Sequence, residues 1–519
     1  MGPEATGRRA VRRAFLAVDD KRGLPEFARS LARHSVELWA TTGTRAALDG
    51  IGVRVGSAEE LTGIADWFGG RVKTLHPAVL GGILAPPGDQ GDRELTARGL
   101  RSFDLVAVNF YPFAERVREK AGEPALVEAI DIGGVTLARA AAKNHARVAA
   151  VSAPEEYAAV GAELDALGGE LSAELRRALA LRTFERVAAY DRCITDGLSG
   201  EASGPFPGRL ELAREEVPLR YGENPHQAAA RYGAADAGSP FSAFPLRSLK
   251  GPSLSYTNLL DLDTAVSVVA EFPAPTAAVV KHATPVGVAS GPDLPTALTR
   301  ALATDPVARY GCAIAVNRPV GRADVPSLKG VFVDLLAAPS VAPDALTALD
   351  GRAKLKVVEV APPALDRPRW EARSALGRLL VQEYDVRQLA PGELKSVTSH
   401  AATPGELAAL DFAWRVVRHA RSNAVVLAAG STTVGIGSGQ PSRVKAVEDA
   451  VAVAGDRARG SVLASDAFFP FADGVEAAGR GGVRAILQPG GSLRDPEVIA
   501  AAERLGIAMY LTGWRVFRH

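Results

Sequence analysis

The chain has 519 residues, enough for two or more domains with their own hydrophobic cores, and its two cysteines, Cys193 and Cys312, are too few for a disulfide framework or a cysteine-based zinc site. Its 60 Lys and Arg residues nearly balance its 59 Asp and Glu residues, so no overall charge favours nucleic acid or an anionic membrane. The hydrophobic fraction is 47%, which is normal for a soluble globular protein, and no uninterrupted apolar run is long enough to span a bilayer. The low cysteine content predicts a protein of a reducing compartment, the cytoplasm.

Residues 1–12 are expected to form a disordered tail. Residues 1–6 fit the loose pattern of a myristoylation site, but no apolar segment of a signal peptide follows the arginines at 8–13. Residues 13–195 then carry the alternating strand and helix signals of a first domain.

An anion site is predicted near the start of this domain. Residues 14–40 read as a buried strand, a helix and a second strand, and Thr41 and Thr44 bracket a glycine where the next helix opens. Free N–H groups at such a turn can bind an anion, and Lys21, after the first strand, adds a positive charge. Helix capping explains the two threonines equally well.

A denser polar cluster lies at residues 69–77. Two glycines there free the backbone, and Arg71, Lys73 and Thr74 follow, a combination that suits phosphate binding by a guanidinium fork and a point charge. A solvated loop is the alternative, although the apolar residues that follow indicate a segment pinned to the domain.

Polar residues also end the later strands of the domain. The strand predicted at 103–109 leads to Tyr111, and Asp131 precedes a helix over 135–144 whose last turn carries Lys143. A lysine at that place is often only a complement to the helix dipole. Repeated strand–loop–helix units nevertheless predict a parallel sheet whose strand ends gather polar side chains and bind ligands.

A Gly/Ser-rich linker, residues 196–212, separates this domain from a second one, residues 213–519. Arg220 and Tyr221 precede a Gly-Glu-Asn-Pro turn, which holds them on rigid backbone, although surface residues of a tight turn have the same pattern. Asn258 lies at the start of a helix, where capping alone explains it.

The segment 277–285 brings two proton-transfer groups to the mouth of a sheet. An apolar strand runs into Lys281 and His282, and Pro285 stops it. An imidazole titrates near neutrality and a partly buried lysine can be tuned towards it, so the pair can move protons at pH 7. A strand end that happens to carry two polar residues is the alternative. By the same pattern, Gly311 and Asp334 read as parts of buried strands.

The last third of the chain holds two more candidate sites. Asn423 enters a strand, and a Gly-rich loop leads into a helix with Arg443. The loose GxGxG spacing of that loop suggests a dinucleotide site, but no acidic ribose-binding residue follows, which argues against an NAD-dependent oxidoreductase. Asp466 stands among three aromatic residues, including Phe468, and such a group suits a pterin ring that stacks and donates hydrogen bonds.

Seven motifs, distributed over almost the whole chain, resemble those of one enzyme family. They read GRVKTLHP, NFYPF, DIGGVTLARAAAKNHARV, LRYGENPHQ, VVKHATPVGVA, GIGSGQPSR and SDAFFPF. The chain is similar in these motifs to the bifunctional AICAR transformylase/IMP cyclohydrolase family, which makes the last two steps to inosine monophosphate. The resemblance implies an α/β protein, with a methylglyoxal-synthase-like parallel-sheet domain and a larger cytidine-deaminase-like domain that is duplicated, although the sequence shows no repeat.

The resemblance makes the first domain the cyclohydrolase, which closes formyl-AICAR with loss of water. The implied catalytic residues are Lys73, Tyr111, Asp131 and Lys143, and the implied substrate contacts are Lys21, Thr41, Thr44, Arg71 and Thr74. The phosphate loops depart from the family pattern, because Ala17 and Asp19 replace two serines and Thr42 replaces a glycine. These changes are expected to weaken phosphate binding. The alternative is therefore a transformylase whose first domain is weakened or only binds a nucleotide.

The resemblance makes the second domain the transformylase, which moves a formyl group from the cosubstrate 10-formyltetrahydrofolate to the 5-amino group of AICAR. The implied catalytic residues are His282 as proton acceptor, Lys281 as charge stabiliser or proton donor, and Asn423. The implied substrate contacts are Arg220, Tyr221, Asn258, Gly311, Asp334, Arg443, Asp466, Phe468, Arg515 and Phe517. No metal, nucleic acid or membrane is expected, and the family implies a homodimer with shared transformylase sites.

Overall fold

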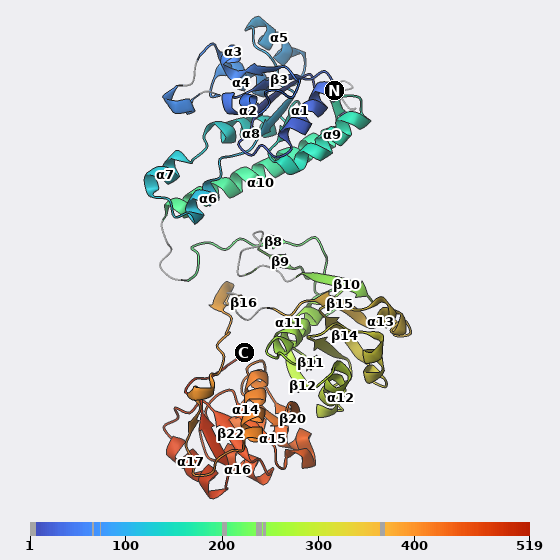
Figure 1. The fold of residues 1–519 in the computed structure, drawn as a ribbon, viewed down its shortest axis with the longest axis vertical. Helices are drawn as coiled ribbons and strands as arrows, with labels where there is room; N and C mark the ends of the chain where they lie inside the picture. Colours follow the sequence, from blue (N-terminus) through green and yellow to red (C-terminus); the bar gives the residue numbers. More distant parts are fainter. Residues whose placement is uncertain are drawn as a thin grey trace. The chain divides into compact units, whose positions relative to one another are not determined.

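The computed structural model describes residues 7–64, 67–72, 74–199, 205–234, 241, 245–363 and 369–519. It divides the chain into two compact units, residues 1–209 and 210–519 (Figure 1). Helix α10 (Ala173–Leu198) continues into the first residues of the expected linker, 196–212. None of the described helices is both long and apolar enough to cross a membrane.

Unit 1 is built on a parallel sheet with the strand order β4-β3-β2-β5-β6. The strands are β2 (Arg13–Ala17), β3 (Glu37–Ala40), β4 (Val55–Ser57), β5 (Leu105–Val108) and β6 (Ala149–Val151). The α-helices are α1 (Leu24–Arg33), α2 (Thr42–Ala46), α3 (Ala58–Thr62), α4 (Pro77–Leu84), α5 (Asp89–Ala97), α6 (Phe113–Arg118), α7 (Glu123–Glu128), α8 (Gly133–Lys143), α9 (Tyr157–Ala166) and α10. The prediction of a parallel sheet with helical crossovers is confirmed.

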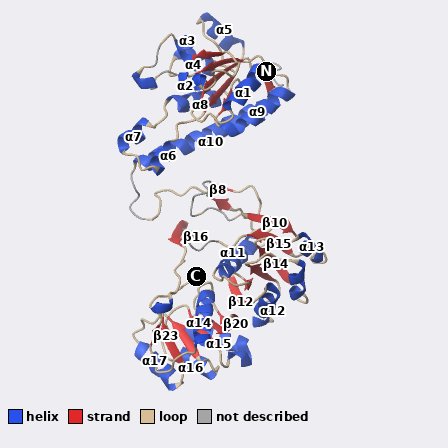
Figure 2. Cartoon of the chain, in the orientation of Figure 1, coloured by secondary structure: helices blue, strands red, loops and turns tan. Residues whose placement is uncertain are grey.

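The two faces of this sheet support separate cores, as the strand period of two requires. Ala14 and Leu16 of β2 pack with α1 and α9, whereas Phe15, between them, packs with α4, α8 and α10. Figure 2 shows the strands of the unit 1 sheet surrounded by the helices of the same unit. Residues 7–12, expected in a disordered tail, include β1 (Arg9–Ala10), which pairs with β7 (Glu170–Leu171).

Unit 2 is built on a mixed sheet with the strand order β10-β15-β14-β13-β11-β12-β20-β19-β21-β22-β23-β18. Its strands are β10 (Leu246–Lys250), β11 (Thr276–Lys281), β12 (Thr284–Ser290), β13 (Cys312–Val316), β14 (Val333–Ala338), β15 (Lys356–Val360), β18 (Lys395–Ser396), β19 (Val425–Ala429), β20 (Thr432–Gly437), β21 (Val462–Ser465), β22 (Ala485–Gln488) and β23 (Ala508–Leu511). Its α-helices are α11 (Tyr256–Ala270), α12 (Leu294–Thr304), α13 (Pro343–Ala348), α14 (Pro404–Val417), α15 (Arg443–Ala454), α16 (Asp473–Arg480) and α17 (Asp495–Arg504). Two strand pairs stand outside this sheet, β8 (Ala213–Arg214) with β9 (Tyr232–Gly233) and β16 (Trp370–Ala375) with β17 (Arg378–Glu383).

The large sheet consists of two copies of one arrangement, so the expected duplication is confirmed. Each half has a helix, a hairpin, a second helix and a strand antiparallel to the first hairpin strand, followed by two more strands in parallel. The halves join where β12 pairs antiparallel with β20 through Ala289 and Thr432. Because the join is antiparallel, the tip of the first hairpin lies at the same sheet edge as the end of β20.

The strand that carries the Lys-His pair ends differently from the prediction. His282 and Ala283 have φ of 55° and 54° and form a two-residue hairpin turn between β11 and β12. Pro285 lies inside β12, next to a register shift at Val279 and Val280. A proline is tolerated at such an irregular position because no regular ladder hydrogen bond is lost. The turn, rather than the proline, ends the strand.

Candidate functional site

A cavity of about 380 Å³ opens in unit 1 at the carboxyl ends of β2, β3 and β5. This is where ligands bind in parallel α/β sheets. Its lining includes five of the predicted residues, namely Thr41, Arg71, Thr74, Tyr111 and Asp131. The structure therefore brings together side chains that are up to 90 residues apart in the sequence, since Thr41 and Asp131 belong to the same lining.

Asp131 is held rigidly at the start of α8. Its Oδ1 accepts a hydrogen bond of 2.7 Å from the Gly134 N–H, and its own N–H donates to the Tyr190 hydroxyl at 2.8 Å. Burial raises the pKa of Tyr190 to about 12, so this hydroxyl stays protonated at neutral pH. Tyr190 was not predicted, because a tyrosine within α10 carries no local signal of a site.

Thr44 and Lys21 stabilise, through hydrogen bonds within the loops, the two segments that are predicted to bind phosphate. The buried Thr44 Oγ1 donates to the Val18 carbonyl at 3.1 Å and accepts from the Val18 N–H at 3.0 Å. The Lys21 ammonium donates to the Asp19 carbonyl at 3.0 Å and also to that of Val18. Asn109, which was not predicted, accepts from the N–H groups of Asp19 and Asp20 and so fixes the same loop.

The remaining predicted residues of unit 1 differ in their positions. Arg71 pairs with Glu128 at the cavity lining, and both side chains are about two-thirds exposed, at 65% each. Lys143 is exposed at the opposite end of α8, roughly 15 Å of helix from Gly133, and is not among the lining residues. Lys73 lies outside the described residues. Of the departures from the family pattern, Ala17 and Asp19 do line the cavity.

In unit 2, contacts on both sides hold the hairpin turn of His282 and Ala283, together with Lys281, the residue just before it. The Lys281 Nζ donates to the Tyr310 carbonyl at 2.9 Å, and the His282 side chain is exposed. The Ala283 N–H donates to Asp261 Oδ1 of α11 at 2.6 Å. Burial raises the pKa of Asp261 above its usual range. Asp261 was not predicted, and it is the side chain that anchors the turn.

A second polar group continues along the same edge of the sheet. The nearly buried Asn258 donates from Nδ2 to Asp334 Oδ2 at 2.8 Å, and the Lys356 ammonium pairs with Asp334 Oδ1 at 2.8 Å. Asn258 also completes a capping box with Ser255, so the capping interpretation holds as well. Gly311 has a φ of 72°, which favours glycine, at the start of β13. Lys356 was missed because its partner lies on a different strand.

Asn423 lies just before β19 with its amide group oriented by two partners. Its Oδ1 accepts from Arg443 at 2.8 Å, and its Nδ2 donates to the Gln440 carbonyl at 2.8 Å. Arg443 in turn pairs with Asp466, whose Oδ1 also accepts from the Ala424 N–H at 3.1 Å.

Asp466, which is predicted to receive a pterin, lies in the interior of unit 2. Its side chain is fully buried, and its second oxygen accepts a hydrogen bond from the Ser422 hydroxyl. A buried carboxylate with these partners neutralises the charge of Arg443. Asp466 thus holds Arg443 and Ser422 on either side of Asn423. Arg443 is itself only 5% exposed, so the two residues form an internal support.

The other predicted contacts are exposed side chains. Phe468 is 39% exposed, whereas its neighbour Phe469 is part of the core. The Arg515 guanidinium lies 4.5 Å from the Phe517 ring centroid. The terminal segment that carries both docks beside Asn423, because the Ser422 N–H donates to the Arg518 carbonyl at 2.8 Å.

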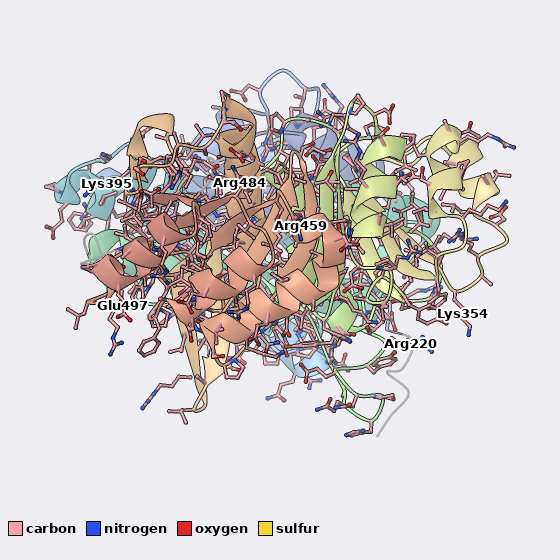
Figure 3. All side chains as sticks on the ribbon, turned by 90° about the horizontal axis from the view of Figure 1, so that it is seen from below. Arg220, Lys354, Lys395, Arg459, Arg484 and Glu497 are labelled. Carbon is pink, nitrogen blue, oxygen red and sulfur yellow. The ribbon has the colours of Figure 1, made fainter. Side chains whose placement is uncertain are left out.

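At the start of unit 2, Arg220 lies over the Tyr221 ring and lines a hollow of about 420 Å³. Figure 3 labels the Arg220 side chain. The Arg220 side chain is exposed to solvent, so a phosphate group could reach its guanidinium.

One edge of the large sheet thus gathers the Lys281–His282 turn and Asn423. Strands β12 and β20 lie between β11 and β19 in the sheet order, and they pair at Ala289 and Thr432, at the edge away from the turn. A small cavity of about 180 Å³ lies between them, lined among others by Thr284, Gly437 and Gln440.

Comparisons with known proteins agree over both units. Residues 23–136 match the MGS-like domain, and residues 141–453 match the AICARFT/IMPCHase bienzyme family. The bifunctional purine biosynthesis protein PurH of Myxococcus xanthus is 44% identical, over 98% of this chain and 100% of its own. The PurH proteins of Sorangium cellulosum and Chloroflexus aurantiacus are 47% and 46% identical, over 98% and 99% of this chain and 100% of their own. The chain therefore belongs to the AICARFT/IMPCHase bienzyme family.

Proposed function

We propose that this protein catalyses the last two steps to IMP. It transfers a formyl group from 10-formyltetrahydrofolate to the 5-amino group of AICAR, and it then closes formyl-AICAR to IMP with loss of water. The observation that carries this proposal is the identity of 44–47% to bifunctional relatives over 98% of the chain, which covers both units. Each unit also has its own cluster of polar residues at a sheet edge.

Ring closure needs the formyl oxygen polarised and the carboxamide nitrogen held in reach, which is mainly orientation and charge stabilisation. The cavity of unit 1 supplies groups for both tasks. Tyr111 and Thr74 offer hydroxyls, and Asp131 is a fixed carboxylate that can take a proton from the attacking nitrogen. Lys73 and Lys143 complete the proposed catalytic set, and Lys21, Thr41, Thr44 and Arg71 complete the proposed substrate contacts.

Formyl transfer starts from a poor nucleophile, because the amine is conjugated into the imidazole ring. The amine nitrogen attacks the formyl carbon, its proton passes to His282, and the bond from the formyl carbon to N10 breaks as N10 takes up a proton. Lys281 lies next to His282, where its ammonium can stabilise the tetrahedral oxygen or donate that proton. Asn423 presents an amide that Arg443 and Gln440 have already oriented. Asp466 pairs with Arg443 and so holds the guanidinium that hydrogen-bonds to Asn423.

Substrate recognition in unit 2 is assigned to the groups along the same edge. Arg220 and Tyr221 are proposed to bind the nucleotide phosphate. Asn258, Gly311 and Asp334 are proposed to contact the AICAR base and ribose, and Phe468, Arg515 and Phe517 to line the remainder of the site. The protein is further proposed to be a cytoplasmic homodimer that needs no metal.

The alternative function is formyl transfer alone. It is favoured by one observation, that Asp19 lines the cavity where the substrate phosphate is expected. A carboxylate there repels a phosphate. The two half-reactions, assayed separately, distinguish the alternatives. A rate of formyl-AICAR cyclisation equal to the uncatalysed rate would leave only the transformylase.

The decisive experiment incubates the protein with AICAR and 10-formyltetrahydrofolate and follows the formation of tetrahydrofolate and IMP. Lys281→Ala, His282→Ala and Asn423→Ala are each expected to abolish formyl transfer and to leave the cyclisation of added formyl-AICAR intact. Near-native transfer by His282→Ala would show that His282 is not the proton acceptor.

A further inference from the structure

Two of the loops that line the cavity of unit 1 carry side chains proposed to act in ring closure. Tyr111 follows β5, and Asp131 lies between α7 and α8. The chain from one loop to the other forms α6 and α7, and both helices pack on α10 (Figure 1). Among the described residues, the cavity lining includes none from α10, so this helix supports the two loops from outside the site.

Tyr190 of α10 contacts both loops, and its hydroxyl holds the one with Asp131. This hydroxyl accepts a hydrogen bond from the Asp131 N–H at 2.8 Å and donates one to the Ala129 carbonyl at 3.3 Å. A tyrosine can do both at once only in its protonated form. Burial raises the pKa of Tyr190 to about 12 and so keeps the hydroxyl protonated at neutral pH. The backbone of residues 129–131 is thus held at both ends by one oxygen atom.

The aromatic ring of Tyr190 contacts the other loop. Its centroid lies 5.0 Å from the Phe110 ring centroid and 6.5 Å from that of Phe113, and these two residues lie on either side of Tyr111 in the sequence. Phe113 is buried, and a Cβ at Gly197 of α10 would lie 2.8 Å from its ring, so the helix and the ring are in close contact. Ring contacts on both sides leave the Tyr111 backbone little freedom to move.

On the cavity side, the Asp131 carboxylate is packed closely against the start of α8. Its Oδ1 accepts the hydrogen bond from the Gly134 N–H, and a Cβ at Gly134 would lie 2.4 Å from its Oδ2. A Cβ at Gly133 would likewise lie 2.8 Å from the Thr74 Oγ1, so this hydroxyl rests on the same backbone. A small movement of residues 129–131 therefore displaces the Asp131 carboxylate and changes its spacing from Thr74.

We propose that Tyr190 is a positioning residue for ring closure, whose hydroxyl sets the place of Asp131 and whose ring sets the place of Tyr111. This inference rests on the proposed cyclohydrolase function of unit 1. Tyr190 does not belong to the cavity lining, so it acts through these two residues and not on the substrate itself. Because a reacting group that is misplaced by about 1 Å can slow a reaction about 100-fold, such a support affects the rate directly.

Two substitutions separate the contributions of the hydroxyl and the ring. Tyr190→Phe removes the hydrogen bonds to Asp131 and Ala129 but keeps the ring contacts, so only the Asp131 loop is released. Tyr190→Leu removes the hydroxyl and the ring together and releases both loops. A role in packing alone predicts a wild-type rate for Tyr190→Phe, because the packed ring remains, whereas a positioning role predicts that loss of the hydroxyl already lowers the rate.

The test follows the cyclisation of added formyl-AICAR, with folding of each variant checked by far-UV circular dichroism. Tyr190→Phe is expected to lower kcat about tenfold and to leave KM within about twofold, because the groups proposed to bind the substrate are unchanged. Tyr190→Leu is expected to lower kcat about 100-fold. Tyr157→Phe is the matched control and should keep the wild-type rate, since Tyr157 is a buried tyrosine of unit 1 that stacks on Phe27 outside the cavity lining.

A wild-type kcat in folded Tyr190→Phe would overturn the proposal, and so would a loss seen in KM alone, which would indicate a change in substrate binding. Formyl transfer, assigned to unit 2, is expected to be unchanged in all three variants, and equal losses of both activities would also contradict the proposal. If the wild-type protein itself does not accelerate cyclisation, the proposed function of unit 1 fails. An active wild-type protein with an unaffected Tyr190→Phe variant refutes this inference alone.

Discussion

The two halves of the large sheet have the same topology but carry different chemistry at equivalent places. The tip of the first hairpin presents Lys281 and His282, and Asp261 anchors it. The tip of the second hairpin is Gly430-Ser431, and the Ser431 hydroxyl donates to the Ser290 carbonyl at 3.0 Å, across the join between the halves. The tip with His282 thus lies at the candidate site, whereas the tip with Ser431 forms a hydrogen bond between the two halves of the sheet.

This difference follows from the antiparallel join. Because β12 and β20 run in opposite directions, the two hairpin tips lie at opposite edges of the sheet. The edge with His282 receives from the second half the residues around Asn423. A duplicated fold can therefore combine the hairpin tip of one half with the strand end of the other, and only one edge needs catalytic groups.

The largest expected effect separates the two tips. His282→Ala removes the proposed proton acceptor. Such a group contributes about 100-fold to 10,000-fold to a rate, so formyl transfer is expected to be abolished. Ser431→Ala, at the equivalent tip, is expected to leave the rate of formyl transfer within about twofold. The Ser431 hydroxyl lies away from the candidate site and donates to the Ser290 carbonyl. Steady-state rates of tetrahydrofolate formation measure both. Equal losses in the two variants would remove the distinction between the tips.

The next prediction concerns the buried support of Asn423. Asp466→Ala leaves the Arg443 guanidinium buried without its counter-charge and is expected to destabilise unit 2 by about 3–5 kcal/mol. Urea unfolding followed by circular dichroism measures the change. Glu497→Ala, which breaks an exposed pair with Arg494, is the control and is expected to change stability little. A silent Asp466→Ala variant would show that the buried pair does not hold this part of the fold.

A pH effect is expected from the buried group between α11 and α14. The His419 Nε2 lies 3.0 Å from Glu271 Oε1, and Arg418 lies 3.4 Å from the same oxygen. Burial lowers the pKa of His419, more than the bond to Glu271 raises it. Burial alone would raise the pKa of Glu271, but the hydrogen bond and charge of His419 and the charge of Arg418 outweigh it, so this pKa is lowered.

Both shifts make the protein less stable in acid. The unfolded chain protonates His419 near its ordinary pKa of about 6.5 and Glu271 near about 4.3, in each case before the folded protein does. Stability is therefore expected to be full above about pH 6.5 and to fall as the pH drops below that value. The melting temperature measured from pH 8 to pH 5 checks this, and His419→Gln is expected to flatten the upper part of the curve. A curve of unchanged slope in that variant would assign the acid sensitivity elsewhere.

The smallest expected effect sharpens the comparison between the two units. Asp19→Ser removes a carboxylate from the cavity of unit 1 and is expected to lower the KM for formyl-AICAR about fivefold, the equivalent of ~1 kcal/mol for one exposed charge. Asp20→Ser is the control, because Asp20 pairs with Arg22 outside the cavity lining. Formyl transfer in unit 2 should not respond to either change. A higher KM for Asp19→Ser would show that Asp19 helps to bind the substrate.

The contacts between distant side chains could not be read from local patterns. Asp466 and Arg443, both predicted as substrate contacts, are buried against each other at a separation of 23 residues. No local pattern distinguishes a carboxylate that faces a ligand from one that neutralises an internal guanidinium. Lys356 and Asp261 were missed for the same reason, since their partners lie on other elements. Pro285 was read as a strand stop, although a register shift lets it lie within β12.

The sequence alone determined the parallel sheet of unit 1, the family, and the placement of a Lys-His pair at a strand end. These depend on local periodicity and on the order of residues along the chain, which folding preserves. Only the tertiary structure decided which polar residues face a cavity, which of them support one another, and that the β16–β17 hairpin stands outside the large sheet. Those properties depend on burial and on pairing between distant segments, and both arise only when the chain folds.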